Sequence, residues 1–249
     1  MRRPPELAQV AALGLIQGAA ELLPVSSSAH VAAVPELLGW ELAGWDAARR
    51  KELEVALHAG AALALAPELL RLLPDARTLA LSLAPPVLVG GLLERAIEER
   101  MGDLVAGLLL GAAALAAADA AGKARVGDGA LQPGLALGLA QAAALIPGVS
   151  RSGATLAAAR ALGYSRAEAS RLSFGVAGPV LVGATALKAW RGRRSADRKL
   201  VAAGVAASFL GTRAALKAFG LERGPLWPFA AERVALAGAI LAVRYRRRP

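Results

Sequence analysis

The sequence of 249 residues contains no cysteine, and aromatic residues make up only 4% of it. The absence of cysteine excludes disulfides, zinc–thiolate sites and a cysteine nucleophile. Charged residues account for 19%, fewer than the roughly 25% of an average globular domain. No segment alternates apolar and polar residues with a period of two, so β-strands are not expected.

Apolar residues are abundant instead. They form 56% of the chain, against roughly 45–50% in average globular domains, and the mean hydropathy is +0.47. This is more apolar surface than a soluble domain of this length could bury, which favours a membrane protein over a coiled coil or a disordered chain. An alanine-rich soluble enzyme is the alternative, because much of the apolar content is alanine.

Charge-poor segments divide the chain, and only the segment 131–150 reaches the usual lower limit for a membrane span, about 17 residues, without a charge. The others become long enough if flanking Lys, Arg and Glu side chains extend toward the interface. Charged turns, including 49–52, 98–100 and 191–194, are expected between the segments. The expected spans lie around residues 55–70, 78–93, 104–118, 172–187, 199–216 and 229–243.

Two further segments are interrupted by proline, serine and glycine, at residues 23–28 and 146–153. Proline ends helices, and non-helical backbone is tolerated at membrane depth only where protein or a watery cavity surrounds it. Each interrupted segment is therefore predicted to form a re-entrant helix–loop–helix hairpin.

The two interrupted segments are copies of one another. A constant offset of 124 residues aligns Gln17 with Gln141 and Val25-Ser26 with Val149-Ser150. The pattern indicates a duplication, with a binding site expected at the interface of the two halves.

The fold class expected is an all-α polytopic membrane protein with two inverted-topology repeats, each a re-entrant hairpin plus three transmembrane helices. The inversion follows because three spans, an odd number, separate the hairpins. One integral membrane domain is expected over 1–249, with repeat 1 at about 1–123 and repeat 2 at about 124–249.

The formal net charge of +10 could indicate nucleic acid, anionic lipid or an anionic substrate. In the expected topology, Lys and Arg concentrate on the side that holds both termini. The positive-inside rule then places both termini in the cytoplasm. The basic excess is explained mostly by topology, and no nucleic-acid partner is expected.

The polar residues that could carry chemistry gather at the two hairpin tips. The first tip supplies Gln17, Glu21, Ser26, Ser27, Ser28 and His30, and the second supplies Ser150, Arg151, Ser152 and Thr155. Hydroxyls, an arginine and a helix N-terminus suit a phosphate, while a carboxylate and an imidazole suit proton transfer or a metal-bound phosphate.

Each of these residues also has a structural interpretation. The serines could cap a helix, Glu21 could reach toward the membrane interface, and Arg151 could anchor at a lipid headgroup. For His58, the second histidine, packing or hydrogen bonding within a span is the favoured interpretation.

Residues 17–30, QGAAELLPVSSSAH, and 147–155, PGVSRSGAT, resemble the two signatures of the bacterial undecaprenyl-diphosphate phosphatases. The resemblance implies a hydrolase of the bacterial plasma (inner) membrane that converts undecaprenyl diphosphate to the monophosphate carrier of peptidoglycan synthesis. It also implies a divalent cation, a site open to the outer side and bacitracin resistance.

Position by position, the family's acidic pair falls on Gln17 and Glu21, its hydroxyl and imidazole on Ser27 and His30, and its arginine motif on Ser150, Arg151 and Thr155. Gln17 stands where some members have a second Glu. Glu21 would then hold Mg²⁺ or Ca²⁺ together with substrate oxygens and water.

The expected catalytic residues are Glu21, Ser27, His30 and Arg151. The expected substrate-binding residues are Gln17, Ser26, Ser28, Ser150, Ser152 and Thr155. His30 is expected to act as general base or acid, and Ser27 either as nucleophile or as a phosphate ligand while water attacks. A transporter that flips polyprenyl phosphate without hydrolysis is the alternative function, and a homodimer is left open.

Overall fold

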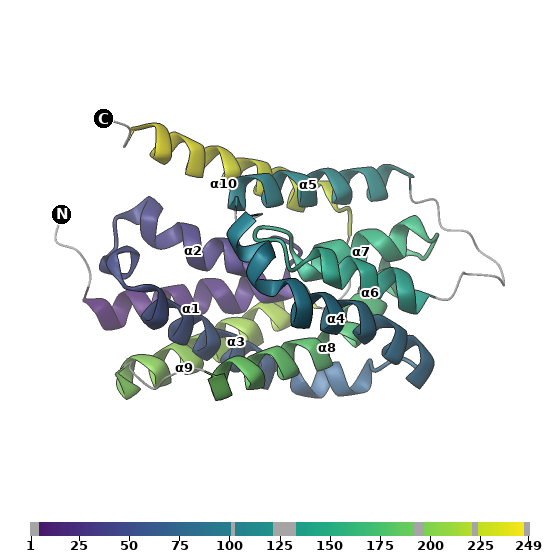
Figure 1. The fold of residues 1–249 in the computed structure, drawn as a ribbon, viewed down its shortest axis with the longest axis horizontal. Coiled ribbons are helices and arrows are strands. Elements are labelled where there is room, and N and C mark those ends of the chain that lie inside the picture. Colours follow the sequence, from purple (N-terminus) through teal and green to yellow (C-terminus); the bar gives the residue numbers. More distant parts are fainter. Residues whose placement is uncertain (1–4, 101–102, 122–132, 192–196, 221–223, 247–249) are drawn as a thin grey trace. The chain divides into compact units, whose positions relative to one another are not determined.

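The computed structural model describes residues 5–100, 103–121, 133–191, 197–220 and 224–246. These residues form ten α-helices and one short 3-10 helix (Figure 1). The elements are α1 (Glu6–Leu22), α2 (Ser27–Leu38), η1 (Glu41–Gly44), α3 (Ala47–Arg71), α4 (Ala76–Arg100), α5 (Leu104–Ala121), α6 (Pro133–Ala143), α7 (Arg151–Ala161), α8 (Arg166–Arg191), α9 (Arg198–Phe219) and α10 (Trp227–Arg246).

All six expected spans are helical, and they correspond to α3, α4, α5, α8, α9 and α10. Within the described residues, four helical stretches are long and apolar enough to cross a membrane: Ala47–Arg71, Ala76–Leu93, Arg166–Leu187 and Arg198–Phe219. Alanine and leucine dominate these stretches, and both are strong helix formers. The structure therefore agrees with an all-helical, multi-pass membrane protein.

The expectation of a charged turn at residues 49–52 is wrong. These residues lie inside α3, where Asp46 Oδ1 accepts a hydrogen bond from Arg49 N at 2.8 Å at the start of the helix. Arg, Lys and Glu are themselves good helix formers, so the helix extends beyond its apolar part. The charges at 98–100 likewise fall in the last turn of α4, and 192–194 lie outside the described residues.

The two interruptions are where the sequence predicts them. α1 ends at Leu22 and α2 begins at Ser27, while α6 ends at Ala143 and α7 begins at Arg151. The helices α2, α6 and α7 contain only 12, 11 and 11 residues, fewer than the roughly 17 that a membrane span requires. Helix–loop–helix hairpins are thus confirmed, and their re-entrant placement stays a prediction.

The chain forms two compact units, and neither is a sequence half. Unit 1 comprises Met1–Leu22, Ser27–Glu68 and Gly178–Gly220; unit 2 comprises Leu23–Ser26, Leu69–Ala177 and Leu221–Pro249. Each unit takes helices from both halves of the sequence. The loop of the first hairpin belongs to unit 2, whereas the helices on either side of it belong to unit 1.

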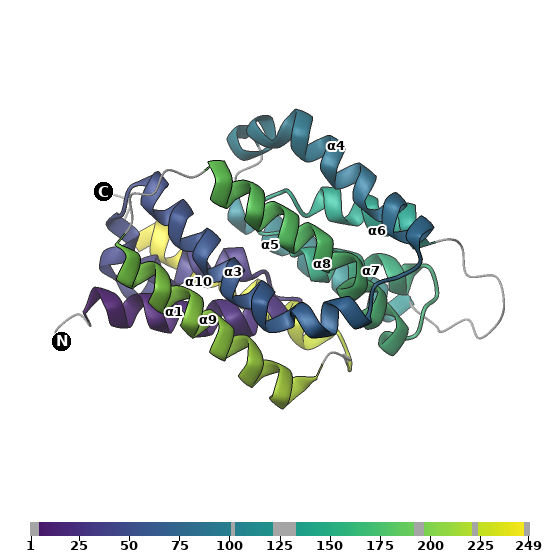
Figure 2. The same cartoon turned by 90° about the horizontal axis from the view of Figure 1, so that it is seen from below.

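Helix pairing within the units follows the sequence repeat. In unit 1, α9 packs along α1 (Figure 2), and in unit 2, α4 packs along α6. The offset of 124 residues carries α1 onto α6 and α4 onto α9, so the two pairs are counterparts. In each pair, the first helix of a hairpin packs against a span from the other half of the sequence. The pairing supports a duplication, and the inverted orientation and the single domain stay predictions.

Glycines allow the close approach in both pairs. A Cβ at Gly14 of α1 would lie 2.8 Å from Ala207 Cβ and 3.0 Å from Gly204 O on α9. At the aligned position of α6, a Cβ at Gly138 would lie 2.6 Å from Leu81 O of α4. Small residues at such contacts let helix backbones pack tightly in a membrane.

A leucine at Gly14 should therefore separate α1 from α9. We expect Gly14→Leu to lower the free energy of unfolding by about 1–3 kcal/mol, the usual cost of overpacking. Thermal unfolding in detergent measures the effect. Gly238→Leu is the matched control, because a Cβ at Gly238 has open space around it. Equal midpoints for the two variants would contradict the close packing.

Candidate active site

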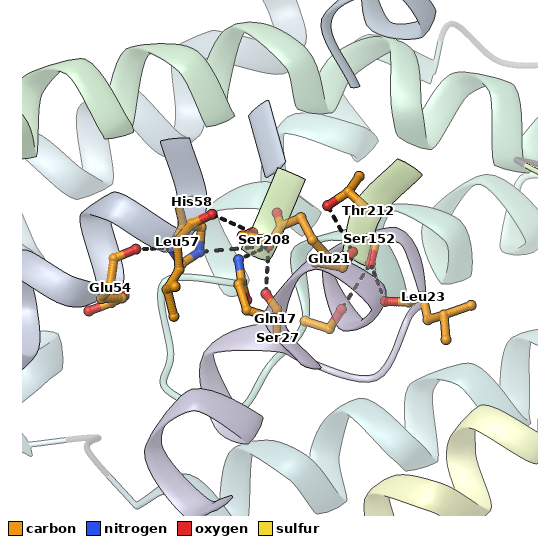
Figure 3. Close-up of polar contacts among 12 residues, drawn as sticks. Gln17, Glu21, Leu23, Ser27, Glu54, Leu57, His58, Ser152, Ser208 and Thr212 are labelled. Carbon is orange, nitrogen blue, oxygen red and sulfur yellow. Dashed lines mark hydrogen bonds and ion pairs between the residues drawn. The ribbon is translucent and has the colours of Figure 1, made fainter. Parts of the chain in front are cut away.

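The carboxylate of Glu21, on the last turn of α1, is the centre of a polar cluster in unit 1 (Figure 3). The residue is only 8% exposed. Its Oε2 accepts hydrogen bonds from Gln17 Nε2 at 3.1 Å and from Ser27 Oγ at 2.6 Å. Gln17 reaches it because residues four apart share a helix face, and Ser27 reaches it from the first turn of α2. The short hydroxyl–carboxylate bond is of the strong, charge-assisted kind.

His58 of α3 also faces this carboxylate. Its Nε2 lies 3.7 Å from Glu21 Oε2, and its Nδ1 lies 2.8 Å from Glu54 O. A carbonyl can only accept, so Nδ1 carries a proton and donates to it, which orients Nε2 toward Glu21. The expectation of a hydrogen bond within a span is confirmed, but the sequence did not associate His58 with Glu21. A lone ionisable residue in an apolar segment is the signal that could have suggested this role.

Two hydroxyls of α9 fix the helices that carry the cluster. Ser208 Oγ donates to Leu57 O of α3 at 2.7 Å, and Thr212 Oγ1 donates to Gly18 O of α1 at 3.1 Å. Both side chains are fully buried. They tie the backbone beside His58 and the backbone beside Glu21 to the same helix.

The remaining residues of the first tip have different surroundings. Ser26 is buried in the loop and has a φ of 69°, a left-handed conformation that is uncommon for a residue other than glycine. Ser28 is exposed, and His30 is half-buried one turn into α2. The structure thus brings Gln17, Glu21 and Ser27 into direct contact.

The second tip, in unit 2, is built around the start of α7. Ser150 caps the helix by accepting from Gly153 N at 3.1 Å, and its Oγ lies 3.1 Å from Ser152 Oγ. Arg151 is the first residue of the helix and is half-buried. A helix N-terminus carries a partial positive charge, so Arg151 adds a full cation where an anion is already favoured.

Thr155 lies deeper in the second tip and is fully buried. Its Oγ1 donates to Arg151 O at 2.9 Å and lies 2.6 Å from Ser173 Oγ of α8. Ser173 Oγ is in turn 3.3 Å from Ser152 O. These contacts hold the first turn of α7 against α8. Ser173 is not among the site residues predicted from the sequence, because its partner Thr155 lies 18 residues away.

Unit 2 also holds the loop of the first hairpin. Ser152 Oγ donates to Leu23 O at 3.3 Å, and Arg233 of α10 donates through Nε and Nη2 to Pro24 O at 2.9 and 2.6 Å. Arg233 is fully buried. Arg233 is not among the site residues predicted from the sequence, because its partner lies 209 residues away.

The oxygen atoms around Glu21 fit a divalent cation that keeps several outside ligands. In the described residues, no three His, Cys, Asp or Glu side chains are grouped so that they could hold a metal ion. However, Gln17 Oε1 is buried without a hydrogen-bond partner, on the same amide whose Nε2 donates to Glu21 Oε2. Mg²⁺ and Ca²⁺ prefer such oxygen ligands, and Mg²⁺ commonly takes only one or two carboxylates plus phosphate oxygens and water.

Comparison with known proteins identifies the chain's family. Residues 10–239 match the family described as "Bacitracin resistance protein BacA". The chain belongs to the BacA family. A relative in Geobacter sulfurreducens, named "Undecaprenyl-diphosphatase", is 36% identical over 97% of this chain and 100% of its own length. Relatives with the same name in Geobacter metallireducens and Sphingopyxis alaskensis are 37% and 33% identical, over 91% and 95% of this chain and 94% and 97% of their own lengths.

Burial of the Glu21 carboxylate should cost this BacA protein stability. The carboxylate accepts hydrogen bonds from a neutral amide and a hydroxyl, and burying a carboxylate costs free energy that a neutral amide of the same shape avoids. We expect Glu21→Gln to raise the free energy of unfolding by about 1 kcal/mol, and so the thermal midpoint by roughly 2–4 °C.

Glu68→Gln is the matched control for this measurement. Glu68 pairs with Arg213 at 3.0 Å, so its neutralisation should leave the midpoint unchanged or lower it. A lower midpoint for Glu21→Gln would mean that the carboxylate stabilises the fold.

Proposed function

We propose that this protein hydrolyses undecaprenyl diphosphate to undecaprenyl phosphate and inorganic phosphate. The observation that carries the proposal is the buried Glu21 carboxylate, which accepts a hydrogen bond from the Ser27 hydroxyl at 2.6 Å. Relatives of this chain are named for the reaction. A hydroxyl hydrogen-bonded to a carboxylate is the arrangement that an activated serine or a positioned phosphate ligand requires.

The first cluster supplies the groups that move protons. If Ser27 is the nucleophile, its proton passes to Glu21 while the Oγ–P bond forms and the bond from phosphorus to the bridging oxygen breaks, releasing undecaprenyl phosphate; water then hydrolyses the phosphoserine to inorganic phosphate. If water attacks directly, Ser27 holds a phosphate oxygen, Glu21 or His30 receives the proton of the water, and the same bond to the bridging oxygen breaks, releasing undecaprenyl phosphate. His30 is the proposed general acid or base, and rapid-quench detection of phosphoserine at Ser27 distinguishes the two routes.

The second cluster supplies positive charge. Arg151 and the backbone amides at the start of α7 are proposed to bind the diphosphate, with Ser150, Ser152 and Thr155 shaping that helix turn. Phosphoryl transfer places negative charge on the equatorial oxygens, and fixed donors stabilise it without reorganisation. An arginine suits this role because its planar fork bonds two oxygens at once. On the first tip, Ser26 and Ser28 stay proposed substrate contacts.

A divalent cation, Mg²⁺ or Ca²⁺, is proposed as the cofactor. Glu21 and Gln17 Oε1 would hold it together with substrate oxygens and water. When bound, the cation would neutralise charge on the diphosphate.

The remaining proposals concern the setting of the reaction. The substrate is a lipid, and the protein is a multi-pass membrane protein. We place it in the bacterial plasma membrane, with both termini in the cytoplasm and the site open to the outer side. Inverted repeats fit the reciprocal helix pairing, and a homodimer is left open. The transporter alternative receives no support from relatives that are named for hydrolysis.

Purified protein should release inorganic phosphate from a C55 diphosphate in detergent or vesicles. We expect EDTA to abolish release and Mg²⁺ or Ca²⁺ to restore it, because the proposed reaction needs a divalent cation and these two cations bind oxygen ligands. His30→Ala serves as a low-activity control in the same assay. Binding of the lipid without phosphate release by the wild-type protein would favour the transporter alternative.

Removal of the arginine at the start of α7 should affect the reaction more than the fold. We expect Arg151→Ala to reduce kcat/KM by about 10³-fold, the usual effect of removing one donor to a transition-state oxyanion, and Arg151→Lys to recover only part of it. Arg244→Ala is the control, since Arg244 is exposed and contacts Asp103 at 3.4 Å. Full turnover by a folded Arg151→Ala variant would refute the assignment.

A further inference from the structure

Arg233 is a fully buried cation in the second turn of α10. A buried arginine among apolar helices costs several kcal/mol unless it is paired, and an ionisable residue inside a membrane span is functional by default. Two of its three guanidinium nitrogens, Nε and Nη2, donate to one acceptor, the carbonyl oxygen of Pro24. That acceptor lies in the loop of the first hairpin, and both residues belong to unit 2.

Two neighbouring helices leave space for this guanidinium. A Cβ at Gly111 of α5 would collide with Nη1, and a Cβ at Gly153 of α7 would collide with Nη2. The third nitrogen, Nη1, is buried without a hydrogen-bond partner and packs against Gly111. The geometry of the guanidinium is therefore set by three helices and a single carbonyl.

The loop that receives these bonds is conformationally strained. Ser26 has a φ of 69°, and a residue other than glycine in this region costs on the order of 1–3 kcal/mol unless its surroundings enforce the conformation. The contacts that hold this loop include the two bonds from Arg233 to Pro24 O and the bond from Ser152 Oγ to Leu23 O. Proline restricts the loop further because its φ is fixed.

The chain passes from Ser26 directly into Ser27, whose hydroxyl donates to Glu21. We propose that Arg233 is a positioning residue for the reaction: it holds the 23–26 loop in its strained conformation and thereby sets where Ser27 presents its hydroxyl. This inference rests on the proposed function. Arg233 does not bind the substrate in this proposal, since Nε and Nη2 are used by Pro24 and Nη1 packs against α5.

The test compares Arg233→Met and Arg233→Lys with the wild-type full-length protein, using phosphate release from a C55 diphosphate and hydrogen exchange of the 23–28 backbone. We expect Arg233→Met to lower kcat by about 100-fold, because a misplacement of about 1 Å costs that much, and to leave KM within about threefold. Arg233→Lys should recover part of kcat, since one ammonium can still donate to Pro24 O. Exchange at 23–28 should increase in both variants.

Two further variants separate positioning from general stability. Gly111→Ala keeps the arginine and its charge but displaces the guanidinium, so it should reproduce the loss of kcat and the faster exchange. Arg160→Met is the matched control, because Arg160 is also buried and donates to a backbone carbonyl, Tyr164 O, at 2.5 Å. It should lower the thermal midpoint without changing exchange at 23–28.

Three outcomes would overturn the proposal. A raised KM with unchanged kcat would make Arg233 a substrate ligand, and unchanged exchange at 23–28 would remove its hold on the loop. An Arg233→Met effect on kcat no larger than that of Arg160→Met would reduce it to a packing residue. Failure of the wild-type protein to release phosphate would instead refute the proposed function, and the exchange measurement needs no substrate.

Discussion

The structure depends on one constraint: where a helix is interrupted among apolar helices, its free backbone groups must be bonded inside the protein. An unpaired carbonyl in hydrocarbon costs several kcal/mol, so such breaks persist only where protein or a watery cavity satisfies them. In the first hairpin, Ser152 and Arg233 bond the carbonyls of Leu23 and Pro24. In the second, Ser150 caps α7. The polar residues at the tips therefore have a structural role, because they bond the free backbone groups of the loops. The proposed catalytic roles are additional to it.

The same constraint governs how charge is distributed. Glu21 is a carboxylate in a mostly apolar environment; an amide and a hydroxyl donate to it, and an imidazole lies close by. Arg233 is a cation whose guanidinium bonds a carbonyl oxygen instead of a carboxylate. Hydrogen bonds of this kind fix the direction in which each group points. A carboxylate that bonds a serine hydroxyl is placed to accept its proton.

Much of the fold could be predicted from the sequence because local features report it. Apolar segments gave six helices, and the Pro/Ser/Gly clusters gave both loops. The expectation of a turn at 49–52 was wrong because hydropathy identifies the apolar part of a helix and does not show where the helix begins or ends. Asp46, which bonds the amide of Arg49, marks the start of α3 more closely than the change in hydropathy does.

The site was only partly predictable. The motifs identified Gln17, Glu21 and Ser27, which lie within ten residues of each other, and their spacing on α1 and α2 brings them together. His58 and Arg233 were visible as ionisable residues in apolar segments, but their partners are 37 and 209 residues away. Nothing in a local pattern says which of many distant groups a side chain will reach.

By itself, then, the sequence determined that this is a membrane protein, where its helices lie, where two helices are interrupted, and which residue types stand at each interruption. These properties follow from composition and short-range spacing, which act along the chain. Tertiary structure decided which helices pair across the repeats and which group faces Glu21. It also decided that a buried arginine from α10 holds the loop beside Ser27. Those choices depend on close helix packing at glycines and on the need to pair each free backbone N–H and C=O group where a helix is interrupted. Both are settled only when distant segments meet.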